Sequence, residues 1–212
     1  MLRTTGFAIP LLLLAAPAQA ASSDTQFWVM ASTSFKPAKD LVATIDVSPR
    51  ARSTTAGNDQ LLTRASLDYT IHKGVSIGAG VAWVESGGPT EVRPHQQITL
   101  TSGPLSLRSR LEERIIDGAP QTGLRLRERV LGKLELDRND QLTASAELFL
   151  TLRPTAVGKP TGVEQVRFNL TELHRVAHNL DLGLAYLLIV TNRAGKPDQI
   201  SHVPQLVISW RL

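Results

Sequence analysis

The stretch LLTRASLDYTIH, residues 61–72, alternates almost strictly between apolar and polar side chains. Its odd positions carry leucine, threonine, alanine, leucine, tyrosine and isoleucine, while its even positions are mostly polar or charged. Successive side chains of a β-strand point to opposite faces, so a period of two predicts a strand with one apolar and one polar face. Residues 61–72 therefore predict a strand whose two faces meet different surroundings.

The same alternation recurs along the chain from about residue 25. Further apolar rows run through residues 41–47, 75–83, 105–111, 124–134, 142–152 and 180–190. Tight turns are predicted at residues 72–74, 102–104, 137–140 and 177–179, and longer loops at 86–94, 116–122, 154–162 and 192–198. Short turns on one side and long loops on the other are typical of barrels in the bacterial outer membrane.

Eleven candidate strands can be counted, whereas bacterial single-chain barrels have even numbers of strands. Tracing the turns back from a periplasmic C-terminus places the segment around Trp28 on the outer side, which makes this first segment the least regular. We predict an all-β, antiparallel up-and-down transmembrane β-barrel of about 10 to 12 strands, with 12 preferred. A soluble periplasmic β-protein would also alternate, and membrane fractionation separates the two.

The first twenty residues contain Arg3, an apolar run over residues 7–16 and the small-residue end Ala18-Gln19-Ala20. This pattern predicts a cleavable signal peptide over 1–20, a single barrel domain over 21–212 and an outer-membrane location. No cysteine is present for a lipid anchor or a disulfide. Removing Arg3 from the 23 basic residues leaves 22 against 19 acidic ones, and so modest a charge on an exported protein predicts no nucleic-acid partner.

The chain ends on an amphipathic strand, with Leu206, Ile208, Trp210 and Leu212 on one face. This end resembles the terminal signal that barrel-assembly machinery recognises, although the usual last residue is aromatic. The machinery and outer-membrane lipid are therefore the predicted partners. Pro204 cannot donate a ladder hydrogen bond and is expected to interrupt this last strand.

The polar faces, which a barrel would turn towards its lumen, are rich in arginine. An unpaired buried charge is costly, so these arginines need acidic partners, water or a ligand. Either a salt-bridge network fills a narrow lumen, or an electropositive interior binds or passes a small anion such as a carboxylate, phosphate or lipid head group. The candidate lumen residues are Arg64, Arg108, Arg110, Glu112, Arg114, Arg125, Arg127, Arg129, Glu147 and Arg167. The acidic residues on the same side are Asp46, Asp68, Glu112, Glu135, Glu147 and Asp181.

Catalysis has few candidates in this sequence. A lipid hydrolase or acyltransferase needs a nucleophile, a base and a carboxylate within reach, and only His95 and the pair Ser201-His202 offer a starting point. No recognised nucleophile motif surrounds them, and no metal-ligand or phosphate-loop motif is present. We therefore expect a protein without cofactor or enzymatic activity, with a lipid-modifying enzyme as the alternative.

Several short motifs extend over nearly the whole chain: Trp28, Arg93-Pro94-His95-Gln96, Arg110-Leu111-Glu112-Glu113-Arg114, Arg125-x-Arg127, Ser145-Ala146-Glu147-Leu148-Phe149, Glu164-Gln165-Val166-Arg167 and Ser201-His202-Val203. Together they resemble the pattern of the domain of unknown function 2490 family. The resemblance implies a proteobacterial outer-membrane barrel, and it implies no activity, ligand or catalytic residue. Aromatic residues are sparser here than the family pattern has them.

The leading functional expectation is a narrow channel, or an anion-binding or head-group-binding barrel, with an arginine-rich lumen. One alternative is a structural or envelope-interaction barrel, in which the loops at 86–94 and 154–162 contact partners. A planar-bilayer recording tests the first expectation, and loop deletion tests the second.

Overall fold

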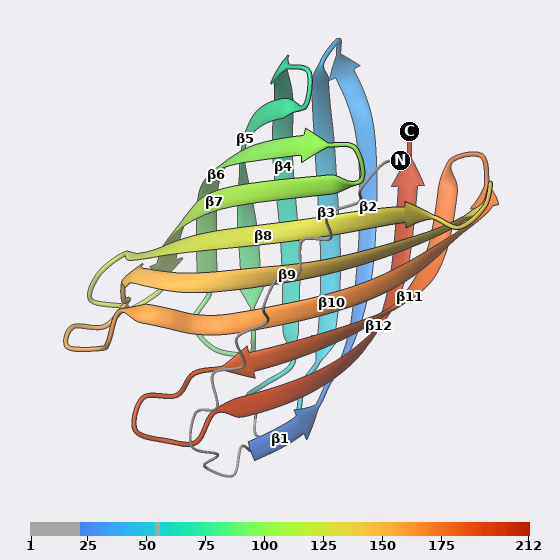
Figure 1. The fold of residues 1–212 in the computed structure, drawn as a ribbon. Coiled ribbons are helices and arrows are strands. Elements are labelled where there is room, and N and C mark those ends of the chain that lie inside the picture. Colours follow the sequence, from blue (N-terminus) through green and yellow to red (C-terminus); the bar gives the residue numbers. More distant parts are fainter. Residues whose placement is uncertain (1–21, 54–55) are drawn as a thin grey trace, which may run out of the picture.

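The computed structural model describes residues 22–53 and 56–212. The predicted signal peptide, residues 1–20, lies outside this part of the chain. All regular secondary structure in the described residues is β-strand (Figure 1). None of it is a helix long and apolar enough to cross a membrane.

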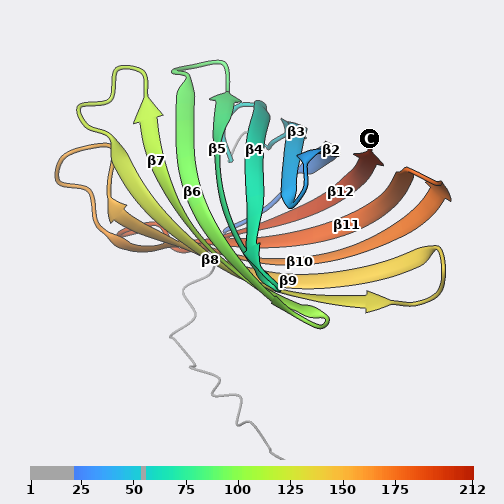
Figure 2. The same ribbon diagram turned by 90° about the horizontal axis from the view of Figure 1, so that it is seen from above.

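The described residues form twelve strands. In chain order they are β1 (Ser22–Thr25), β2 (Phe27–Ala38), β3 (Leu41–Ala51), β4 (Gln60–His72), β5 (Val75–Glu85), β6 (Glu91–Ser102), β7 (Leu105–Ile116), β8 (Gly123–Glu135), β9 (Asp140–Arg153), β10 (Gly162–Ala177), β11 (Leu180–Thr191) and β12 (Gln199–Arg211). Each strand from β2 to β12 pairs antiparallel with the next, and β12 returns to pair with β2. The sheet thus closes on itself, with β2 beside β12 (Figure 2). The all-β up-and-down barrel predicted from the sequence is confirmed.

The strand number is also as predicted, but the twelve strands do not make an even barrel. Within the described residues, eleven strands close the barrel and β1 is an additional short strand. An odd number of alternating strands brings the first and last together in parallel, and β12 indeed pairs parallel with both β1 and β2. The irregularity expected around Trp28 is this parallel closure.

Pro204 explains why β1 and β2 are separate strands. The register is the same on both sides of the gap, because Thr25 lies opposite His202 and Trp28 opposite Gln205. The backbone N–H of Gln26 donates to the carbonyl oxygen of His202 at 2.9 Å. In a parallel ladder the carbonyl of Gln26 should accept from residue 204, but proline has no N–H to give. The prediction that Pro204 interrupts the last strand is wrong, since β12 is continuous and its neighbour is broken instead.

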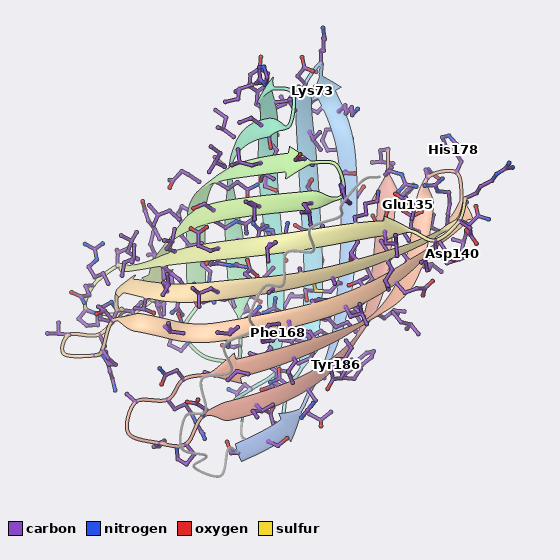
Figure 3. The ribbon with its side chains drawn as sticks, viewed as in Figure 1. Lys73, Glu135, Asp140, Phe168, His178 and Tyr186 are labelled. Carbon is purple, nitrogen blue, oxygen red and sulfur yellow. The ribbon has the colours of Figure 1, made fainter. Side chains whose placement is uncertain are left out.

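The two mouths of the barrel differ in the length of their connections. Tight turns join β2 to β3, β4 to β5, β6 to β7, β8 to β9 and β10 to β11, and the C-terminus lies at this same end. Lys73, Glu135, Asp140 and His178 mark this end, which we call the turn side (Figure 3). The longer loops and β1 lie at the opposite end, the loop side. The predicted alternation of turns and loops is confirmed, but Glu91–Ser102 is strand β6, so the loop predicted at 86–94 is shorter.

Turn-side connections are held by local geometry. Asp40, Gly74 and Gly103 each have a positive φ in two-residue turns, which such turns require. In the β8–β9 turn, the backbone N–H groups of Asn139 and Asp140 donate to Asp137 Oδ1 at 2.7 and 2.8 Å. These hydrogen bonds hold the pKa of the Asp137 carboxyl below its ordinary value.

Outward-facing positions carry the apolar rows that the alternation predicted. Leu184 on β11 and Leu67 on β4 are examples, with 67% and 52% of their surface exposed. Phe168 and Tyr186 lie on the same outer surface, midway along their strands (Figure 3). Inward-facing positions hold the arginines and carboxylates described next, so the two faces of every strand meet different surroundings.

Candidate functional site

A cavity of about 480 Å³ occupies the loop-side part of the lumen. Its charged lining is strongly unbalanced, because ten arginines face four carboxylates among the described residues. The arginines are Arg50, Arg52, Arg64, Arg93, Arg108, Arg114, Arg125, Arg127, Arg129 and Arg167, and the carboxylates are Asp46, Glu91, Glu147 and Glu164. The cavity is thus a polar space with an excess of six positive charges.

The centre of the charged wall is built around two glutamates. Glu112 on β7 accepts hydrogen bonds from Arg125 Nη2 and Arg127 Nη1, both at 2.6 Å. Glu147 on β9 accepts from Arg108 Nη2 at 2.7 Å and from Arg127 Nη2 at 2.9 Å. Arg127 therefore bridges both carboxylates, and three neighbouring strands are tied together by charge-assisted hydrogen bonds.

Two further glutamates extend this network towards the loop side. Glu91 on β6 accepts from Arg93 Nη2 and from Arg114 Nε, each at 2.5 Å. Glu164 on β10 lies 3.7 Å from Arg114 Nη1 and 3.5 Å from Arg125 Nη1. The network thus runs without interruption from β6 to β10, and it fixes the relative positions of these five strands.

Like charges also face each other directly in this wall. Arg108 lies opposite Arg129, and Arg110 lies opposite Arg127, in the β7–β8 ladder. Directly opposed like charges destabilise a pair of strands. Glu112 and Glu147 compensate part of this repulsion, but they are shared among more arginines than they can neutralise.

Four arginines of the cavity have no carboxylate partner, and one of them, Arg52, donates to the backbone carbonyls of Asn58 and Ala56. Within residues 22–53 and 56–212, no carboxylate oxygen lies within 4.0 Å of the guanidinium groups of these four, which are Arg50, Arg52, Arg129 and Arg167. Arg50 and Arg167 instead stack on aromatic rings: Arg50 Cζ lies 4.0 Å from the centroid of Trp28, and Arg167 Cζ lies 4.4 Å from that of Phe149. These arginines supply the positive charge that the network leaves unbalanced.

A family model described as "Protein of unknown function (DUF2490)" matches residues 25–200. The chain belongs to this family. No curated protein matches it in sequence. The identification agrees with the motif resemblance found in the sequence, and it carries no activity or ligand with it.

Two solved structures are similar to this DUF2490 protein. A structure titled "NanC porin structure in rhombohedral crystal form" has a TM-score of 0.52 at 8% identity, covering 78% of this chain and 81% of the porin. The outer-membrane-expressed OmpT of Vibrio cholerae has a TM-score of 0.41 at 12% identity, covering 71% of this chain and 55% of OmpT. At 8% identity, the likeness to the porin concerns the barrel fold alone.

The ten predicted lumen residues of this DUF2490 protein all lie on the inner side of the barrel wall. Eight of the ten predicted residues line the cavity: Arg64, Arg108, Arg114, Arg125, Arg127, Arg129, Glu147 and Arg167. The other two are buried in the wall, where Arg110 donates two hydrogen bonds to Gln97 Oε1 and Glu112 binds Arg125 and Arg127.

The predicted acidic partners divide into two groups. Asp46, Glu112 and Glu147 pair with lumen arginines, Asp46 accepting from Arg64 at 2.8 Å. The other three lie outside the network: Asp68 accepts from Gln97, Glu135 pairs with Lys133, and Asp181 pairs with Arg211.

The structure separates the residues considered for catalysis. Ser201 points into the barrel and donates a hydrogen bond to Asp24, whereas His202 lies on the outside with its Nδ1 against the hydroxyl of Tyr186. Adjacent strand residues face opposite sides, so these two cannot act as one pair. His95 is buried inside the barrel next to Gly80. Nowhere in the described chain do three histidine, aspartate or glutamate side chains gather as a metal site.

Sequence reasoning missed several members of the site. Arg50 continues the inward row of Asp46 and Ser48, so the alternation itself could have identified it. Glu91 and Arg93 were hidden because residues 86–94 were predicted as a loop. Phe149 is almost fully buried and points into the lumen. It was not predicted there, because it stands in the sequence between the outward-facing Leu148 and Leu150.

Proposed function

We propose that this protein is an outer-membrane barrel that admits small anions from the loop side and binds them in its arginine-lined lumen, as a narrow anion-selective channel. The observation that carries the proposal is the ratio of ten arginines to four carboxylates around one cavity. A cleft lined by one sign of charge with low-dielectric walls concentrates the opposite ion, and rings of arginine favour anions in pores. The outer-membrane fold supports the location.

The glutamate network supports two different roles for the lumen arginines, one structural and one in anion binding. Six arginines, at positions 93, 108, 110, 114, 125 and 127, have carboxylate partners and hold the strands in register. This structural role corresponds to the salt-bridge network that the sequence analysis gave as one of two alternatives. Arg50, Arg129 and Arg167 take no part in those pairs, so an anion can compete for them without breaking the wall.

A planar-bilayer recording under a potassium chloride gradient tests the proposal. We expect the purified barrel to conduct, and its reversal potential to lie closer to the equilibrium potential of chloride than to that of potassium. In a double variant Arg50→Glu, Arg167→Glu, two positive charges become negative and the net charge of the lumen falls by four, so the chloride preference should fall about tenfold or invert. Absence of conductance, together with absence of any anion-dependent rise in thermal stability, would contradict the proposal. Recovery of the protein in the soluble fraction without detergent would contradict the membrane location.

The last strand supports a second proposal, which concerns assembly. The proposed signal for the barrel-assembly machinery is the outward row Leu206, Ile208, Trp210 and Leu212, of which Trp210 and Leu212 are 49% and 69% exposed. In cells, Trp210→Ala should lower the amount of folded barrel several-fold, because the machinery binds this end. Refolding of the purified variant into detergent should match the wild type. Equal loss in both settings would mean that Trp210 serves stability alone.

A further inference from the structure

We infer that Arg50 and Arg167, gathered at the ring of Trp28, form the primary binding site of the lumen, and that its ligand is an oxyanion, a carboxylate or a phosphate group. This inference rests on the proposed anion-binding function and makes it more specific. It distinguishes one pair of guanidinium groups from the general positive charge of the cavity.

Neutral side chains already bind the guanidinium groups of Arg50 and Arg167. Arg50 donates to Gln60 Oε1 at 2.8 Å and to Ser48 Oγ at 3.3 Å, and Arg167 donates to Gln165 Oε1 at 2.5 Å. All three acceptors are neutral. In the part of the chain that the structure describes, neither guanidinium has a carboxylate within ion-pair distance. Their charges are therefore oriented by hydrogen bonds without being neutralised.

Trp28 holds both guanidinium groups on the inner wall of the barrel. Its indole is 5% exposed and packs against Leu187, Ile189 and Val203 on the inner wall, and its Nε1 donates to Gln26 Oε1 at 3.0 Å. Arg50 Cζ lies 4.0 Å and Arg167 Cζ 5.7 Å from the centroid of this fixed ring. Arg50 reaches the ring from β3 and Arg167 from β10, so one aromatic residue gathers two unneutralised guanidiniums from separate strands.

Arg167 also lies over a second ring, that of Phe149. Arg167 Cζ and Arg127 Cζ lie 4.4 and 4.3 Å from the centroid of Phe149. Arg127 is fully engaged by Glu112 and Glu147, whereas Arg167 on the same ring is not. A ligand that approaches Phe149 from the cavity therefore meets Arg167 as the guanidinium with free donors.

The chemistry of the free donors defines the ligand class. Stacking over a ring engages the face of a guanidinium and leaves N–H groups at its edge, which match two oxygens of one carboxylate or phosphate. A halide ion has one centre and cannot use the fork in this way. Two such groups favour a doubly charged oxyanion, so phosphate and sulfate should bind more tightly than acetate, and acetate more tightly than chloride.

Trp28 provides a reporter for the test. The chain contains three tryptophans, and the other two, Trp83 and Trp210, lie on the outer surface with 48% and 49% of their area exposed. A variant with Trp83→Phe and Trp210→Phe leaves Trp28 as the one emitting indole. This barrel, refolded in detergent, is titrated with phosphate, sulfate, acetate or chloride at constant ionic strength. We expect a saturable change in Trp28 emission with the oxyanions and none with chloride.

Three further substitutions in this background identify the site. Arg50→Gln and Arg167→Gln should each weaken sulfate binding about tenfold, because each removes charge-assisted donors. Arg64→Gln is the matched control: it removes one positive charge from the same cavity, but from an arginine already paired with Asp46. It should weaken binding less than about threefold. The mobility shift of each variant on boiling, in gel electrophoresis, verifies that the barrel has folded.

The outcomes separate this inference from the function on which it rests. A response that survives unchanged in Arg50→Gln and Arg167→Gln, or that chloride produces equally well, overturns the inference, while anion-selective current would keep the proposed function intact. A wild-type barrel that shows no anion selectivity overturns both the inference and the proposed function. Saturation by phosphate and sulfate supports a phosphate-like group as the ligand, and saturation by acetate supports a carboxylate.

Discussion

A Glu112→Gln variant is expected to lose about 3–5 kcal/mol of folding stability, which is the cost of removing one partner from a buried ion pair. Glu112 is 3% exposed and binds Arg125 and Arg127 through separate oxygens. The neutral amide keeps the shape of the side chain but cannot balance these charges, and Arg110 also lies 3.8 Å from the lost carboxylate. Urea unfolding in detergent, followed by intrinsic fluorescence, measures the change.

Glu135→Gln is the matched control for this prediction. It makes the same chemical change in an ion pair at the turn side. The side chain of Lys133 in this pair is 45% exposed and that of Glu135 is 59% exposed. Solvent-exposed pairs contribute about 0–1 kcal/mol, so this variant should unfold close to the wild type. Similar losses in the two variants would mean that the lumen is wet enough to solvate Arg125 and Arg127 without Glu112.

Gly183→Val is expected to prevent the barrel from folding. The side chain at this position would point inwards from β11, and its Cβ would overlap the backbone carbonyl oxygen of Glu172 and approach Leu173 Cδ2 to 2.8 Å. Backbone cannot move aside as a side chain can, so β10 and β11 would have to separate. Overpacking usually costs about 1–3 kcal/mol, and a clash with backbone should exceed this range. The loss of the fast-migrating folded band in unboiled gel samples measures the effect.

Gly132→Val on β8 is the control, because a Cβ there meets nothing closer than 3.8 Å, at Leu105 Cδ2. Valine also suits strands better than glycine, so this variant should fold as the wild type does. If Gly183→Val folds equally well, the close approach of β10 and β11 at Gly183 is relaxed in the membrane.

The alternation of apolar and polar residues was sufficient to predict the barrel and most of its lumen. Once the leucine row of a strand such as β8 faces outwards, Arg125, Arg127 and Arg129 must face inwards, because the side-chain period is exactly two. Eight predicted residues consequently line the cavity. The inward and outward positions of a strand follow from this period without knowledge of the tertiary structure or the ligand.

The pattern could not show which partner each arginine takes. Glu147 lies directly opposite Arg129 and Arg167 in the ladders, yet it binds Arg108 and Arg127. Long side chains reach diagonally across the sheet, and their choice depends on the three-dimensional packing of all the neighbours. The parallel closure was equally hidden, since the rule of even strand numbers argued against it.

The parallel seam also determines how this chain could be rearranged. In a barrel with an even number of alternating strands, both ends emerge at one mouth, and a short linker can join them to give a circularly permuted protein. Here Ser22 lies at the loop side and Arg211 at the turn side. A linker between them would have to cross the full height of the wall, about 10 residues at 3.3 Å each. Such a linker would be a new strand in its own right, and a permuted chain would become an even, fully antiparallel barrel.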